Sequence, residues 1–129
     1  MPLTPQDLTC LREAIALAAA ARAHGNHPFG ALLAVNGEIL ARAENTVNTG
    51  ADVTQHAELN LVRLAQQQLP QEVLAQATLY TSTEPCPMCS GAIYWAGIPR
   101  VVYACSEEAL YGLSGGGLAL PCREVFARG

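Results

Sequence analysis

The side chains best suited to chemistry belong to two cysteines and to a histidine and a glutamate earlier in the chain: Cys86, Cys89, His56 and Glu58. The cysteines stand three apart in the stretch PCPMC, and the other two stand two apart in the stretch HAE. A C-x-x-C pair can form a redox disulfide, supply part of a structural zinc site or provide two ligands of a catalytic zinc site. Each alternative gives the protein a different function.

The histidine and the glutamate discriminate among these alternatives. A redox pair needs no further side chain, so it leaves His56 and Glu58 without a role. A structural zinc site usually has four protein ligands, and Cys105 or His24 would have to complete it, although neither has a paired spacing. A catalytic zinc site has three protein ligands and leaves the fourth position for water. We therefore favour a catalytic site with His56 and the two cysteines as ligands.

Glu58 is best interpreted as a proton carrier and not as a ligand. Zinc lowers the pKa of its bound water to about 7, and a neighbouring carboxylate can take that proton and pass it on. The alternative for Glu58 is a solvated carboxylate that interacts with a helix dipole. The three ligand-type residues nearby make the catalytic role the better interpretation.

The spacing of these residues places them at the starts of two helices. Cys86 and Cys89 share one face at a helix start, where the positive end favours thiolates. His56 and Glu58 would point about 200° apart around a helix, so they converge only if they reach over its N-terminal end. In an α/β sheet such helix starts gather at the carboxyl edge of the strands. We expect one site between two helix starts, near residues 55 and 86.

Three helices are expected from capping signals and apolar periodicity. The first has Thr4 as its N-cap with a proline in the next position, and it ends at Gly25. The second covers residues 55–69 and is stopped by Pro70, and the third starts with the cysteine motif and ends at Gly97. The apolar positions at helical spacing are Leu8, Leu11, Ile15, Ala18 and Ala19 in the first helix and Leu59, Val62, Ala65 and Leu69 in the second.

The strands predict an α/β fold with a mixed sheet. Residues 29–35 and 38–44 flank Asn36-Gly37, a favoured pair for a tight β-hairpin, and a polar loop, 45–54, follows. Strands at 77–82 and 100–105 alternate with helices, which indicates parallel pairing. We expect a three-layer α/β/α sandwich. In the tail, 106–113 suits a short helix, the glycine run is flexible in composition, and the last segment suits a strand or a short helix.

Composition predicts one domain, residues 1–129, and a small neutral partner. Half of the residues are hydrophobic, the net charge is −4, and seven arginines are scattered along a chain without lysine. Nucleic-acid binders usually carry a basic stripe, so we expect no nucleic acid as partner. No apolar run approaches the roughly 18–20 residues of a membrane helix, and the first residues do not resemble a secretory signal. These features predict a cytoplasmic protein with no membrane partner.

The remaining cysteines and an apolar patch on the third helix lead to two further predictions. An odd number of cysteines without an export signal argues against a disulfide framework, so we expect them as small buried hydrophobes. An exposed-looking apolar patch on the third helix predicts a homodimer. The cysteines are Cys10, Cys105 and Cys122, and the patch is Ile93, Tyr94 and Trp95.

HAE followed by PCPMC resembles the H-x-E…P-C-x-x-C signature of the zinc-dependent cytidine/deoxycytidylate deaminase superfamily, and the resemblance runs from about Pro28 to Arg100. It implies a three-layer α/β/α fold, a homo-oligomer and hydrolytic removal of an amino group from a base. It further implies that one Zn²⁺ per chain is held by His56, Cys86 and Cys89. Glu58 would carry the proton from zinc-bound water to a ring nitrogen and then to departing ammonia.

Within the superfamily the chain is most similar to the guanine deaminases of purine metabolism. The similar stretches are PFGA at 28–31, Asn45 and EPCPMCSGAIYWAG at 84–97. The resemblance implies that Asn45 bonds the base edge, although a turn residue closing the hairpin is an equal alternative. Trp95 is better explained by core packing than by stacking on the base. The expected substrate contacts are Phe29, Gly30, Ala31, Asn45, Ala57 and Pro85.

The tail departs from the guanine deaminase pattern and leaves the substrate open. That branch supplies a carboxylate from its C-terminal segment, but residues 111–121 hold no Asp or Glu, so Glu107, Glu108 or backbone carbonyls would have to substitute. The segment 112–129 is either lid-like or truncated relative to relatives. A cytosine or isocytosine deaminase is the alternative, since residues 97–104 are similar to cytosine deaminases. A tRNA adenosine deaminase and an inactive zinc-stabilised binding protein are the further alternatives.

Overall fold

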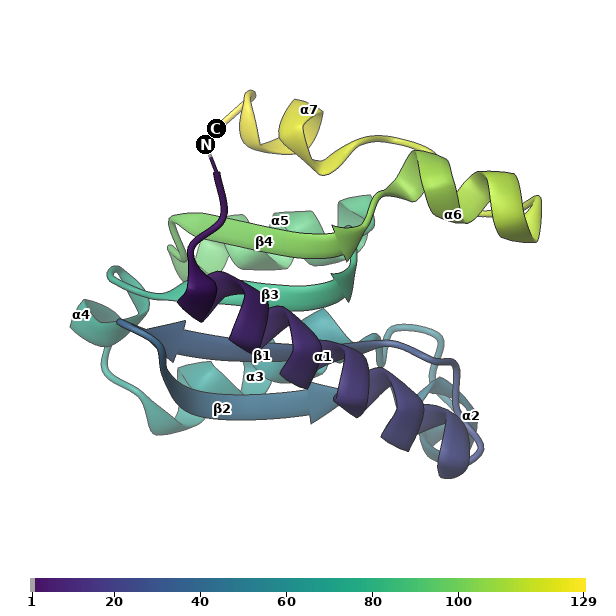
Figure 1. The fold of residues 1–129 in the computed structure, drawn as a ribbon, viewed down its shortest axis with the longest axis horizontal. Helices are drawn as coiled ribbons and strands as arrows, with labels where there is room; N and C mark the ends of the chain where they lie inside the picture. Colours follow the sequence, from purple (N-terminus) through teal and green to yellow (C-terminus); the bar gives the residue numbers. More distant parts are fainter. Residues whose placement is uncertain (1) are drawn as a thin grey trace.

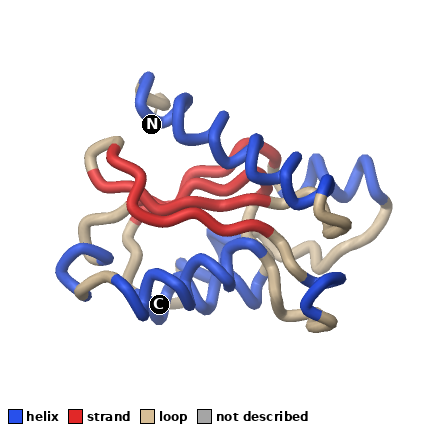
Figure 2. Tube along the Cα trace, turned by 90° about the horizontal axis from the view of Figure 1, so that it is seen from below, coloured by secondary structure: helices blue, strands red, loops and turns tan. Residues whose placement is uncertain are grey.

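The structure, a computed structural model, describes residues 2–129 as one four-stranded sheet covered by helices on both faces (Figure 1). Helix α1 lies on one face, and α3 and α5 lie on the other (Figure 2). The predicted α/β/α sandwich is confirmed. The helices and strands are α1 Pro5–Ala23, β1 Gly30–Val35, β2 Glu38–Glu44, α2 Val47–Gly50, α3 Ala57–Gln68, α4 Gln71–Leu74, β3 Thr78–Thr83, α5 Pro87–Ala96, β4 Arg100–Cys105, α6 Glu107–Ser114 and α7 Cys122–Phe126.

The sheet is mixed, as predicted, and its strand order is β2-β1-β3-β4. Strand β1 runs antiparallel to both β2 and β3, whereas β3 and β4 are parallel. Asn36 and Gly37 have φ of 51° and 81°, the positive values that a type I′ hairpin requires. This topology brings the C-terminal ends of β2, β3 and β4 to one edge of the sheet, together with the start of β1.

Two apolar layers hold the three parts of the sandwich together. Leu33 and Leu79 face α3 and α5 and pack with Leu61 and Ile93. On the opposite face, α1 contributes Cys10, Leu11 and Ala14 to a smaller cluster with Leu32, Tyr80 and Val102. These layers fix the distance between α3 and α5, whose N-terminal ends bear the candidate ligands.

Helix α1 buries two of its five predicted apolar positions, Leu11 and Ala18, but the rest of its buried face differs from the prediction. Leu8 and Ile15 are 43% and 50% exposed, and the stripe toward the sheet instead runs through Asp7, Cys10, Leu11, Ala14, Ala18 and Ala21. The helix is apolar on most of its circumference, so periodicity alone cannot select one face. Asp7 selects it, because its buried carboxylate is bonded to two residues of the sheet.

Asp7 joins the start of α1 to strands β3 and β4. Its carboxylate accepts two hydrogen bonds from the Arg100 guanidinium, at 2.9 and 2.8 Å, and one from the Tyr80 hydroxyl at 2.5 Å. It also closes a capping box with Thr4, which confirms Thr4 as the N-cap. Arg100 and Tyr80 hold the pKa of the Asp7 carboxyl well below its usual range.

Asp7→Asn is expected to lower the free energy of unfolding at pH 7 by about 2 kcal/mol, because it removes a charged acceptor from a buried network. The folded-state pKa of Asp7 is lowered, so its stabilisation is present above the pKa of an unfolded aspartate, about 4, and is lost as pH falls below it. The difference in urea unfolding between the two proteins should therefore shrink from pH 5 to pH 3, both pH values being about one unit from that pKa.

The control for this prediction is Glu13→Gln. Glu13 and Arg42 form an ion pair whose side chains are 40% and 50% exposed, so its loss should change the free energy of unfolding by less than about 0.5 kcal/mol. An Asp7→Asn effect as small as that of the control would contradict the structural role of Asp7.

Several local predictions are corrected or refined by the structure. The loop 45–54 contains the short helix α2, and α4 follows Pro70. The last segment forms helix α7 and not a strand. The apolar patch is only partly exposed, because Ile93 is fully buried while Trp95 is 83% exposed. The described part of the chain has no helix long and apolar enough to cross a membrane.

The burial of α3, of the free cysteines and of Trp95 can also be compared with the sequence predictions. In α3 the buried positions include Leu61 and Val62, whereas Leu59 is only half-buried. Cys10 and Cys122 are buried, as expected of small hydrophobes, and Cys105 is half-buried. Trp95 takes neither of the roles considered for it: it does not pack in the core, and it is not among the described residues that line the pocket beside His56 and Glu58.

Candidate metal centre and active site

The candidate ligands lie at the N-terminal ends of α3 and α5, as the spacing predicted. His56 is the N-cap of α3 and Cys86 is the N-cap of α5, both with extended backbones. Neither side chain caps its own helix, so both are free to bind something else. Cys89 sits in the first turn of α5 and is buried. Two helix starts thus bring three ligand-type side chains together.

The geometry of these three side chains fits a zinc ion. The His56 Nδ1 atom lies 3.6 Å from the Sγ atoms of both Cys86 and Cys89. In a tetrahedral site with Zn–S of about 2.3 Å and Zn–N of about 2.0 Å, sulfur and nitrogen lie about 3.5 Å apart. One imidazole and two sulfurs also suit zinc chemically. A three-ligand zinc site fits the residues present.

No fourth protein ligand joins these three side chains in the described part of the chain. Among residues 2–129, the cluster that could hold a metal ion consists of His56, Cys86 and Cys89, whose ligand atoms all lie within 4.8 Å of one another. Cys105 and His24, which a closed structural site would need, are not members of it. The arrangement is that of a site with an open position, which is typical of catalytic zinc.

The electrostatics of the site follow from burial and from the facing thiols. Cys89 and the facing imidazole of His56 hold the pKa of the Cys86 thiol well below its ordinary value, which favours a thiolate. Glu58, in the first turn of α3, is only 6% exposed. Burial raises the pKa of its carboxyl to about 7, in the range of a group that exchanges protons near neutral pH.

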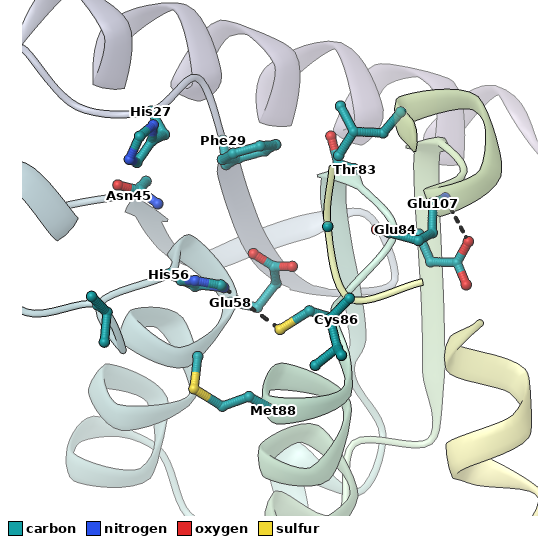
Figure 3. Close-up of a pocket in the computed structure, with 14 residues that line it drawn as sticks. His27, Phe29, Asn45, His56, Glu58, Thr83, Glu84, Cys86, Met88 and Glu107 are labelled. Atoms are coloured by element: carbon teal, nitrogen blue, oxygen red, sulfur yellow. Dashed lines mark hydrogen bonds between the residues drawn. The ribbon is translucent and has the colours of Figure 1, made fainter. Parts of the chain in front are cut away.

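The open side of this cluster faces a pocket of about 350 Å³, near the lower end of the range for small-molecule sites (Figure 3). The carboxylate of Glu58 points into it, between His56 and Cys86 (Figure 3). The residues lining the pocket are His27, Phe29, Asn45, Val53, His56, Glu58, Thr83, Glu84, Cys86, Met88, Glu107, Leu110, Gly117 and Leu118.

The topology explains why these residues meet. Phe29 precedes β1 and Asn45 follows β2, while Thr83 ends β3 and Glu107 follows β4. All four therefore lie at the edge of the sheet where α3 and α5 begin. Ligands of α/β proteins commonly bind at such an edge.

The predicted substrate contacts divide into two groups. Phe29 and Asn45 line the pocket. Gly30, Ala31, Ala57 and Pro85 are buried beside the site and are not among the described residues of its wall, so their contact with substrate stays a prediction.

Asn45 is held in one orientation by its own loop. Its Oδ1 atom accepts a hydrogen bond from the Val47 N–H at 3.0 Å, and its backbone N–H donates to the Phe29 carbonyl at 3.0 Å. The amide oxygen thus already has one partner, and the Nδ2 group remains available as a donor. Asn45 is thus a turn residue that also lines the pocket, and its hydrogen bond to a base stays a prediction.

The C-terminal segment reaches the site through Glu84, which sequence reasoning missed. Its carboxylate accepts the Glu107 N–H at 2.9 Å and the Cys122 N–H at 2.7 Å. Burial alone would raise the pKa of Glu84, but these donors lower it below its usual range. Glu84 thereby ties the starts of α6 and α7 to the end of β3. Its place directly before PCPMC was the available signal.

Comparison with known proteins agrees with the geometry. Residues 4–105 match the family described as the cytidine and deoxycytidylate deaminase zinc-binding region. The chain belongs to this family. Its class is that of the aminohydrolases, enzymes that remove an amino group by hydrolysis of a C–N bond.

The names of three similar proteins mention three different substrates. The chain is 47% identical over 113 residues to a probable cytosine deaminase of Schizosaccharomyces pombe, covering 87% of this chain and 68% of that protein. It is 45% identical over 97 residues to a guanine deaminase of Bacillus subtilis, covering 74% and 62%. It is 42% identical over 98 residues to a tRNA-specific adenosine deaminase of the same organism, covering 76% and 61%.

Solved structures of guanine deaminases share the fold. The Bacillus subtilis enzyme superposes with a TM-score of 0.72 at 37% identity, over 87% of this chain and 71% of that one. Guanine deaminase from Nitrosomonas europaea superposes with a TM-score of 0.76 at 25% identity, over 100% and 75%. The cytidine deaminase-like fold expected from the sequence is confirmed.

Proposed function

We propose that the chain is a zinc-dependent hydrolytic deaminase of a small free nucleobase, with guanine as the first candidate. The observation that carries the proposal is the buried carboxylate of Glu58. It lies beside three zinc-type ligands, at a pocket large enough for one heterocycle. A structural zinc site has no use for such a carboxylate.

Each side chain of the centre has a distinct task in this reaction. His56, Cys86 and Cys89 would hold the zinc ion, which would supply the Lewis acidity that makes water nucleophilic at neutral pH. Glu58 accepts the proton that the water loses and donates it to a ring nitrogen of the base. Glu58 then transfers the second proton of the water to the departing amino group, so that a C–N bond is exchanged for a C–O bond and ammonia leaves. Its burial keeps bulk water from this transfer.

Phe29 and Asn45 hold the base in this proposal. Phe29 offers an aromatic surface at the start of β1, and Asn45 offers an Nδ2 donor at the end of β2. The donor meets an acceptor on the base, such as a carbonyl oxygen or an unprotonated ring nitrogen. Guanine has such acceptors, and so does cytosine.

A pyrimidine such as cytosine or isocytosine is the second candidate, because the relative from Schizosaccharomyces pombe is named a probable cytosine deaminase. An adenosine in tRNA is less favoured despite the similarity to a tRNA-specific enzyme. The net charge of −4 and the absence of lysine give little attraction for a polyanion. An inactive zinc-binding protein is the remaining alternative, and it leaves Glu58 without a purpose.

The direct test is ammonia release from guanine, cytosine, isocytosine, adenosine and an adenosine-containing RNA stem-loop, using zinc-loaded protein. We expect turnover of at least one free base and the highest kcat/KM for guanine. A preference for the RNA would contradict the use of net charge. The absence of ammonia from every substrate, in protein that carries zinc, would favour the inactive binding protein.

We also infer a homodimer and one zinc per chain. Tyr94 and Trp95 are 45% and 83% exposed on the outer side of α5, which is a costly place for two aromatic rings in a monomer. Light scattering at micromolar concentration measures the mass, and a monomer would contradict the homodimer.

A further inference from the structure

Glu107 is the third acidic residue of the pocket, beside Glu58 and Glu84, and the deamination chemistry gives it no role. It is the first residue of α6, lines the pocket with Leu110 of the same helix and is only 7% exposed. In the described range 2–129, the hydrogen bond in which Glu107 takes part is made by its backbone N–H, and no donor reaches its carboxylate. Among the described residues no fully buried side-chain oxygen lacks a partner, so the carboxylate oxygens of Glu107 reach the solvent of the open pocket. A ligand that filled the pocket would cut them off from water, which is costly unless the ligand supplies a hydrogen-bond donor.

The position of this carboxylate is fixed from two sides. Glu84 holds the backbone of Glu107 through the 2.9 Å hydrogen bond from its N–H. Gly117 lies against the carboxylate, since a Cβ atom there would come within 2.8 Å of the Glu107 Oε1 atom. Gly117 also has a φ of +141°, which favours glycine. The glycine run therefore leaves room for Glu107 at the wall.

The surroundings of Glu107 raise the pKa of its carboxyl above the ordinary value. Burial raises the pKa of its carboxyl, and the negative charges of Glu84 and Cys86 raise it further. A neutral N–H donor from a ligand would lower the pKa of Glu107 again, because the hydrogen bond stabilises the ionised carboxylate. Glu108, the next residue, is exposed and does not line the pocket.

Asn45 and Glu107 approach the pocket from opposite ends of the sheet edge. Asn45 follows β2 and Glu107 follows β4, the first and last strands in the order β2-β1-β3-β4. Three strand spacings, roughly 14 Å in all, separate the ends of β2 and β4. The two side chains extend into this gap from both sides and shorten the distance that a ligand has to span. A ligand between them meets a hydrogen-bond donor at one end and an acceptor at the other. It must therefore carry an acceptor on one edge and an N–H on the opposite edge.

We propose that Glu107 determines specificity by accepting a hydrogen bond from a ring N–H of a free base, so that the site takes free bases and excludes their nucleosides. In a nucleoside this ring nitrogen is bonded to the sugar, and the carboxylate would be left buried without a donor. Sites built to bond a substrate N–H discriminate strongly against analogues that lack it. The inference rests on the proposed deaminase function and applies to guanine and cytosine alike.

The test compares the wild-type protein with Glu107→Ala and Glu107→Gln, using Glu108→Gln as the matched control. For the free base that is turned over, kcat/KM is measured beside that of its nucleoside and of the base methylated on the ring nitrogen that carries the sugar. We expect Glu107→Ala to lower kcat/KM for the free base about 10- to 100-fold, mainly through KM. The preference for the free base over its methylated analogue should fall by a similar factor. Glu108→Gln should match the wild type.

The outcomes separate this inference from the deaminase proposal. An active Glu107→Ala protein with the wild-type preference for the free base overturns the inference alone. If the wild type releases no ammonia from any base, the deaminase proposal fails. Calorimetric titration of the zinc-loaded proteins with guanine and cytosine then decides the role of Glu107. If Glu107→Ala binds the base more weakly than the wild type does, the role of Glu107 is supported. If both proteins bind the base equally, or neither binds it, that role is overturned. If thermal unfolding shows that Glu107→Ala does not fold, Glu107→Gln, which keeps the shape and removes the charge, takes its place.

Discussion

Glu58→Gln is expected to lower kcat by about 10²- to 10⁴-fold while zinc content and thermal stability stay near those of the wild type. Glutamine keeps the size and the hydrogen-bonding shape of the side chain but cannot accept and return a proton. Glu58 is buried and belongs to no ion pair in residues 2–129, so removing its charge breaks no such contact. Steady-state ammonia release gives kcat, and elemental analysis gives the zinc content.

This substitution also separates the enzyme from the inactive zinc-binding protein. Glu72→Gln, at an exposed position of α4, is the matched control and should keep the kcat of the wild type. If Glu58→Gln turned over substrate as fast as this control, Glu58 would not be the proton carrier, and the mechanism would be wrong. If Glu58→Gln lost its zinc as well, its effect would be on the metal centre and not on proton transfer.

The residues of the metal centre were predictable because their geometry is local. Cys86 and Cys89 share one helical turn, and His56 and Glu58 share one helix start, so their spacing in the sequence fixes their directions. Only the distance between the two helix starts depends on the fold. Alternating strands and helices were sufficient to predict that both starts reach one edge of the sheet.

The rest of the pocket was less accessible to sequence reasoning because distant segments form it. Glu107 is held at the site by Glu84, 23 residues earlier, which accepts a hydrogen bond from its backbone N–H at the start of α6. The face of α1 was partly misassigned for a similar reason, since Asp7 is paired with Arg100 at a separation of 93 residues. Helices as short as α2 and α4 are below the length at which periodicity identifies an element.

Cys86→Ala is expected to reduce the zinc content from about one per chain to nearly none and to abolish turnover. Removing one of three ligands leaves an imidazole and a single thiol, which hold zinc far more weakly than the full set. Because bound metal stabilises the folded state by mass action, the variant should unfold at the temperature of chelator-treated wild-type protein. A chelator should lower the unfolding temperature of the wild type and leave that of the variant unchanged.

Cys105→Ala is the matched control, because it removes a free cysteine that lies outside the cluster. We expect it to retain zinc, turnover and the response to chelator. Loss of zinc in this variant would mean that Cys105 is a fourth ligand, and the centre would then be a closed structural site. A Cys86–Cys89 disulfide or an iron–sulfur cluster in protein purified without oxidation would instead support the redox alternative. The pair of variants thus measures whether the centre keeps the open position on which hydrolysis depends.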